Sequence, residues 1–169
     1  MGPELIFTYE MTSAAMTQRY AELLGTWIES GMVITLQGEL GAGKTTFTQG
    51  FARGLGIHSL VNSPTFTIVK VHRKGRMTLY HIDAYRLADS DEDLGFEEFF
   101  YGQGVSVVEW PQYVQRFLPP ATIDISLTIL DETRRMVTIA AQDTRLVALL
   151  RKVDMAWNEL STSIPPSAI

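Results

Sequence analysis

The sequence contains no cysteine and no long run of apolar residues. Without cysteine the chain can form no disulfide bond, no cysteine-ligated zinc site and no cysteine nucleophile. A membrane-spanning helix needs about 18 or more consecutive apolar residues, and no such run is present. The first ten residues also lack the basic start and long apolar stretch of a secretory signal. We therefore expect a cytoplasmic protein that makes no contact with a membrane.

The chain also lacks an excess of positive charge, an internal repeat and a low-complexity linker. Its formal net charge is −5, which argues against a protein that wraps nucleic acid unaided, because phosphate binding needs a concentrated basic surface. A length of 169 residues with 46% hydrophobic residues is typical of one domain with a sizeable core. We expect that domain to span residues 1–160 and to be followed by a flexible C-terminal tail, residues 161–169.

Residues 38–45 read GELGAGKT, an unbroken G-x-x-x-x-G-K-[ST] phosphate-binding loop, or P-loop. Its glycines let the backbone curl until the N–H groups point at phosphate oxygens. Lys44 reaches the outer phosphates, and the Thr45 hydroxyl can ligate Mg²⁺. No Asn-Lys-x-Asp guanine signature is present, which makes a Ras-like GTPase a poor fit. The sequence therefore predicts a nucleoside-triphosphate site with the phosphate-binding residues Gly38, Gly41, Ala42, Gly43, Lys44, Thr45 and Thr46.

The segments around the P-loop predict a strand before it and a helix after it. Val33 to Leu36 is apolar and β-branched, and Phe47, Phe51 and Leu55 recur on one helical face. Short connections predict two antiparallel hairpins. The expected fold class is α/β, a P-loop NTPase-like mixed β-sheet flanked by helices. Further strands are expected at 5–9, 66–72, 77–83, 105–109, 123–130 and 136–141, and helices from Thr12 or Ser13 to Gly31 and at 91–100, 111–119 and 146–160.

Two acidic residues each end a predicted strand. Asp83 ends the segment Leu79-Tyr80-His81-Ile82-Asp83, the form expected of a Walker B element, and Glu109 ends 105–109. If both strands run parallel to the P-loop strand, both carboxylates reach the phosphate end of the sheet. One would then ligate the metal, directly or through water, and the other would orient the attacking water. The residues leave open which acid takes which role, and whether Asp83 only caps the following turn.

Three further features have both a functional and a structural interpretation. Thr65, in Ser63-Pro64-Thr65, either offers its hydroxyl to Mg²⁺ or the γ-phosphate or lies in a simple strand-entry turn. Trp110 either stacks on a base or a partner at a loop tip, or is buried in the core. The basic segment 70–76 either docks RNA or an acidic partner, or is only solvated. The three histidines lack metal-ligand spacing, and we interpret them as structural.

Four segments taken together closely resemble the TsaE family, formerly YjeE, over roughly residues 5–141. They are GELGAGKTTFTQG (38–50), NSPTFTIV (62–69), YHIDAYRL (80–87) and VVEWPQ (107–112). The P-loop alone is shared by many families, whereas this ordered set is far more specific. The resemblance implies a bacterial P-loop ATPase, with ATP and Mg²⁺ as cofactors, that acts in the biosynthesis of threonylcarbamoyladenosine in tRNA, next to the anticodon.

The resemblance also implies roles for single residues. Residues 41–46 would hold the phosphates, and Thr45 and Glu109 would ligate Mg²⁺. Asp83 would be the Walker B acid, important for turnover. The other implied neighbours of the nucleotide are Thr65 in a switch-like loop, Trp110, the helix start from Ala14 to Thr17 near the adenine, and an arginine of the last hairpin, for which Arg134 is the nearest candidate.

The family works with partner proteins, TsaD and TsaB, which carry out the threonylcarbamoyl transfer. The resemblance implies that ATP hydrolysis resets their complex between turnovers and that tRNA is held mainly through the complex. Two other functions compete with this one. A small-molecule kinase would share the P-loop but needs an arginine-bearing lid. A non-catalytic ATP switch is favoured by Ala84, which follows Asp83 where many Walker B elements carry a glutamate base.

Overall fold

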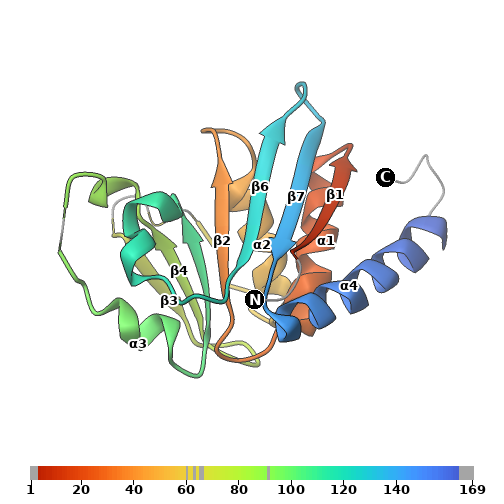
Figure 1. Ribbon diagram of the computed structural model, residues 1–169. Helices are drawn as coiled ribbons and strands as arrows, with labels where there is room; N and C mark the ends of the chain where they lie inside the picture. Colours follow the sequence, from red (N-terminus) through yellow and green to blue (C-terminus); the bar gives the residue numbers. More distant parts are fainter. Residues whose placement is uncertain (1–3, 60, 63, 65–66, 91, 164–169) are drawn as a thin grey trace.

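The apolar segment before the P-loop forms β2 (Val33–Gly38), at the centre of a seven-stranded sheet (Figure 1). The computed structural model describes residues 4–59, 61–62, 64, 67–90 and 92–163. Strand β2 lies parallel to both of its neighbours, β5 (Val105–Glu109) and β6 (Ile123–Ile129), and β5 is parallel to β4 (Leu79–Asp83). The carboxyl ends of these four strands therefore meet at one edge of the sheet, which is where ligands bind in open α/β sheets.

Antiparallel strands complete both sides of this parallel centre. Strand β3 (Val69–His72) pairs with β4, β7 (Arg135–Ala141) pairs with β6, and β1 (Leu5–Met11) pairs with β7. The strand order is β1-β7-β6-β2-β5-β4-β3. The expected mixed α/β sheet with two antiparallel hairpins is confirmed.

Helices cover the sheet in two separate groups (Figure 1). The helices α1 (Ala14–Trp27), α2 (Lys44–Gly54) and α4 (Thr144–Ser163) share the larger apolar core with the sheet. The helix α3 (Phe96–Phe100) and the 3₁₀ segments η1 (Tyr85–Leu87) and η2 (Pro111–Phe117) share a smaller core over β4 and β5. In the part of the chain that is described, no helix is long and apolar enough to cross a bilayer.

Several element boundaries differ from the sequence-based expectation. Helix α1 ends at Trp27 because Ile28 is extended, and Gly31 is a turn residue whose N–H donates to the Gly104 carbonyl. The segment expected to be a helix at 111–119 is 3₁₀ and ends at Phe117. Helix α4 continues to Ser163, past the boundary predicted at residue 160.

Close packing of α1 on α2 fixes the position of the P-loop helix. Gly25 of α1 faces the Phe51 carbonyl, whereas Gly50 and Gly54 of α2 face the Gln18 and Glu22 carbonyls of α1. A Cβ atom at any of the three glycines would collide with one of these backbone oxygens. The two helix backbones can therefore approach each other only because these positions lack side chains.

We expect Gly54→Ala to lower the free energy of unfolding by about 1–3 kcal/mol, the usual cost of overpacking. The direction is diagnostic, because alanine in a helix is otherwise favoured over glycine by about 1 kcal/mol. Urea unfolding monitored by circular dichroism measures the change. Met155→Ala, on the exposed surface of α4, is the control and should stay within about 0.5 kcal/mol. A Gly54→Ala protein as stable as the parent would contradict this account of the helix contact.

Candidate nucleotide-binding site

The P-loop connects β2 to α2 through two residues in left-handed conformations. Gly41 has φ 83° and Gly43 has φ 108°, and residues with a Cβ rarely adopt such values. Between them, the Ala42 N–H donates to the Glu39 carbonyl at 3.0 Å. Among the residues that the structure describes, no side chain caps the start of α2 at Gly43. The N–H groups of the first turn of α2 therefore remain available to an anion, which the helix dipole also favours.

Lys44 is held against the loop from which it projects. Its Nζ donates to the Gly38 carbonyl at 2.5 Å and to the Glu39 carbonyl at 3.2 Å. Nζ also lies 4.5 Å from the centre of the Trp110 ring. Burial lowers the pKa of Lys44, whereas the nearby charges of Glu109 and Asp83 act in the opposite direction. The ammonium group thus lies beside two carboxylates in a partly desolvated environment.

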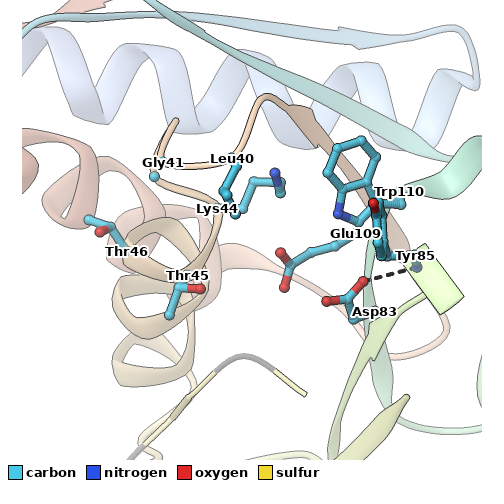
Figure 2. A pocket seen from close by; sticks show the side chains of 10 residues that line it. Leu40, Gly41, Lys44, Thr45, Thr46, Asp83, Tyr85, Glu109 and Trp110 are labelled. Carbon is cyan, nitrogen blue, oxygen red and sulfur yellow. Dashed lines mark hydrogen bonds between the residues drawn. The ribbon is translucent and has the colours of Figure 1, made fainter. Parts of the chain in front are cut away.

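The two predicted acids lie side by side. Asp83 and Glu109 are paired in the register of β4 and β5, and each is at most 5% exposed. Their carboxyl groups point into a pocket of about 570 Å³ that Lys44 and Thr45 also border (Figure 2). Oδ1 of Asp83 accepts the Tyr85 N–H at 3.0 Å, so this acid both caps the following turn and lines the pocket.

The chemistry of this pocket fits Mg²⁺ bound together with phosphate. Thr45 offers a hydroxyl oxygen, and Asp83 and Glu109 offer carboxylates, which are the hard oxygen ligands that Mg²⁺ prefers. No group of three or more His, Cys, Asp or Glu side chains that could cage a metal occurs within the described ranges. Mg²⁺ usually takes only one or two carboxylates and completes its shell with water and substrate phosphate. The residues present fit that pattern.

Trp110 lines the pocket and does not lie within the core. It is half-buried, packs against the smaller core, and contacts the Tyr85 ring in a tilted arrangement, with an interplanar angle of 58° and a ring-centre distance of 5.2 Å. Its backbone is left-handed, with φ 57°, which is unusual for a bulky residue and is typical of functional sites. The structure therefore places Trp110 at the pocket wall, between the lysine and an exposed tyrosine (Figure 2).

A second hollow of about 360 Å³ adjoins the P-loop on its other side. The start of α1 contributes Ala14 and Thr17, and the loop contributes Ala42 and Thr46. The start of α1 at residues 14–17 therefore lies next to the P-loop, as predicted. The hollow has the position and the size to receive the nucleoside part of a nucleotide whose phosphates lie on the loop.

The arginine that reaches the P-loop is Arg135, not Arg134. Its Nε donates to the Ala42 carbonyl at 3.1 Å, and its Nη2 donates to the Gly41 carbonyl at 3.2 Å. Arg134 lies in the turn before β7, where it bonds Asp131 and Glu10. The sequence signal that could have identified Arg135 is the alternation of side chains along β7, because Arg135 points to the same face as the core residues Val137 and Ile139.

Two other features were predicted from the sequence, a role for Thr65 and a basic segment at residues 70–76. Thr65 lies outside the described residues, so its role stays a prediction. In the basic segment 70–76, Arg76 serves the fold, because its Nη2 donates to the Gly25 and Ile28 carbonyls, at 2.7 Å each, at the end of α1.

Sequence reasoning missed the connection between His81 and the pocket. His81 is fully buried, and its Nε2 lies 2.6 Å from Oε2 of Glu109. His81 and Asp83 are at positions i and i+2 of β4, so both side chains are on the same face of the sheet. No motif spacing predicts this contact, because it depends on the register between β4 and β5.

Comparison with known proteins identifies the family. The model of the family "Threonylcarbamoyl adenosine biosynthesis protein TsaE" matches residues 11–137. The chain belongs to the TsaE family. The TsaE protein of Bacillus subtilis is 45% identical over 137 residues, which are 81% of this chain and 87% of the relative. The TsaE protein of Treponema pallidum is 47% identical over 130 residues, which are 76% of this chain and 96% of the relative.

The fold is also that of a solved structure. The crystal structure of Bacillus subtilis YdiB superposes with a TM-score of 0.81 at 35% sequence identity. The match covers 92% of this chain and 99% of that chain. The predicted TsaE resemblance and the predicted α/β fold are therefore both confirmed.

Arg134 and Arg135 provide a matched pair of variants. Arg135→Ala removes the bonds to the P-loop carbonyls, and we expect it to weaken binding of a fluorescent ATP analogue by about tenfold, since bonds to charged groups contribute about 1.5–3 kcal/mol. Arg134→Ala removes only bonds to Asp131 and Glu10 and should bind within about twofold of wild type. Equal losses in the two variants would show that the hairpin acts through its overall charge.

Proposed function

We propose that this protein binds and hydrolyses ATP in the biosynthesis of tRNA threonylcarbamoyladenosine, acting with TsaD and TsaB and resetting their complex between turnovers. The observation that carries the proposal is the convergence of Lys44, Thr45, Asp83 and Glu109 on one pocket below a curled P-loop. The names of the relatives support the pathway, because they are tRNA threonylcarbamoyladenosine biosynthesis proteins.

On this proposal the triphosphate lies along the P-loop and the first turn of α2. Lys44 exchanges its bonds with the Gly38 and Glu39 carbonyls for charge-assisted bonds to the outer phosphates. Thr45 and Glu109 hold Mg²⁺, which neutralises charge that develops on the phosphates. Asp83, anchored by the Tyr85 N–H, orients water next to the γ-phosphate. The adenosine lies toward Ala14, with Trp110 closing the opposite wall.

Weak hydrolysis by the isolated protein follows from the same geometry. The residue after Asp83 is Ala84, so the common glutamate base of a Walker B element is missing. The mouth of the pocket carries two large exposed side chains, Leu40 and Tyr85, which are 92% and 54% exposed. Exposed apolar groups around a functional pocket favour coverage by a partner protein. We infer that the partner complex completes the site, and that tRNA is bound mainly by that complex.

The metal role of Glu109 can be separated from nucleotide binding itself. We expect Glu109→Ala to weaken nucleotide binding about 10- to 100-fold in Mg²⁺ and by much less in EDTA, because only the first state uses the carboxylate as a ligand. Titration of a fluorescent nucleotide in the two buffers measures both affinities. Glu97→Ala, on the exposed surface of α3, is the matched control. Equal losses in both buffers would argue against a metal role.

The resetting role predicts a specific defect in a reconstituted modification reaction. With wild-type protein, TsaD, TsaB, tRNA and ATP, many modified tRNAs should form per complex. Lys44→Ala loses charge-assisted bonds worth about 1.5–3 kcal/mol each, so modification should stop near one product per complex. Lys152→Ala, on the exposed face of α4, should behave like wild type. Continued turnover with Lys44→Ala would exclude the proposal, and a phosphorylated acceptor in place of free phosphate would indicate a kinase.

A further inference from the structure

His81 is a buried histidine with one ring nitrogen used and the other without a protein partner. Its Nε2 lies 2.6 Å from Glu109 Oε2, and its side chain is 0% exposed. Nδ1 is buried and has no hydrogen-bond partner among the residues that the structure describes. An unsatisfied buried polar atom costs about 1–3 kcal/mol. An apolar residue at this position on β4 would avoid that cost, so packing alone does not account for a histidine here.

Glu109 explains why a histidine is useful at this position. Its carboxylate is 3% exposed, and a buried carboxylate needs hydrogen-bond donors. The contact with His81 occupies Oε2, while Glu109 still lines the pocket (Figure 2). The carboxylate is therefore held at Oε2, and Oε1 remains as the oxygen that can contact a group bound in the pocket.

The positions of both residues are set by the sheet. In the parallel register of β4 and β5, His81 lies opposite Val107, and Glu109 lies two residues further along β5. The contact is thus a diagonal one between neighbouring strands, on the face that carries the P-loop helix. Both strands are fixed from their other sides, β4 by β3 and β5 by β2. The backbone segments that carry the imidazole and the carboxylate are therefore held in a fixed register relative to each other.

We propose that His81 is a positioning residue that donates its Nε2–H to Glu109 and fixes that carboxylate so that a single oxygen meets the divalent cation. This inference rests on the proposed function, in which Glu109 is a metal ligand. Partners of ligating groups commonly set ligand orientation, and their loss typically costs about 10- to 100-fold in metal affinity or activity. His81 itself does not touch the nucleotide or the metal.

A pair of substitutions tests the donor directly. His81→Leu has a similar volume but no donor, whereas His81→Gln offers an amide N–H at about the distance of Nε2 from the backbone. In Mg²⁺ and ADP, with binding followed by intrinsic tryptophan fluorescence, we expect His81→Leu to raise the dissociation constant about 10- to 100-fold. In EDTA it should stay within about twofold of wild type. His81→Gln should recover most of the loss in Mg²⁺.

His72 provides the control. It lies on the neighbouring strand β3 with a buried Nε2 that has no hydrogen-bond partner in the described part of the chain. His72→Leu should leave the ratio between the ADP dissociation constants in Mg²⁺ and in EDTA at its wild-type value. The inference is overturned if His81→Leu binds Mg²⁺–ADP like wild type, if His81→Gln is as weak as His81→Leu, or if the loss is equal in EDTA.

A second measurement needs no variant at His81. In a protein labelled with ¹⁵N at its histidines, the His81 resonances should show a proton on Nε2 that exchanges slowly with solvent and shifts in Glu109→Gln. An unprotonated Nε2 would overturn the inference even if His81→Leu failed to fold. A wild-type protein whose ADP affinity is the same in Mg²⁺ and in EDTA would instead overturn the metal role of Glu109, and with it the proposed function.

Discussion

The burial of Lys44 next to two carboxylates is the constraint on which the rest of the structure depends. Removing charged groups from water is costly unless opposite charges and hydrogen bonds compensate. Here the ammonium group has two loop carbonyls and the field of Asp83 and Glu109, and each carboxylate has a fixed donor or contact of its own. Such an arrangement requires that the P-loop, the end of β4 and the end of β5 be held in fixed positions relative to one another.

The sheet and its helices provide that placement. Parallel pairing of β2, β5 and β4 brings the P-loop and the two acids to one edge, because the carboxyl ends of parallel strands coincide. The glycine contacts between α1 and α2 fix the helix that begins at Lys44. Arg135 holds the P-loop from the opposite side, through the Gly41 and Ala42 carbonyls. The parallel strands, helix α2 and the β6–β7 hairpin therefore each constrain the position of the P-loop.

The sequence predicts the parts of this site that depend on local chemistry. A P-loop motif, two strand-ending acids and two short-looped hairpins predicted the fold, the strand–loop–helix arrangement of the P-loop and the neighbours Asp83 and Glu109. The contact of His81 with Glu109 was not predictable, since it joins residues 28 positions apart through a register that only the folded sheet defines. Arg135 differs from His81, because its parity with Val137 and Ile139 along β7 could have distinguished it from Arg134.

The two walls of the pocket differ in a way that bears on regulation. The inner wall consists of buried groups whose positions the sheet fixes, namely Lys44, Asp83 and Glu109. The outer wall consists of the exposed Leu40 and Tyr85 together with Trp110, whose backbone is strained. On the proposed function, the rigid inner wall binds phosphate and metal, whereas an open outer wall admits bulk water and weakens electrostatic catalysis. On the proposed function, a partner that covers the outer wall would exclude that water and speed hydrolysis without altering any buried residue.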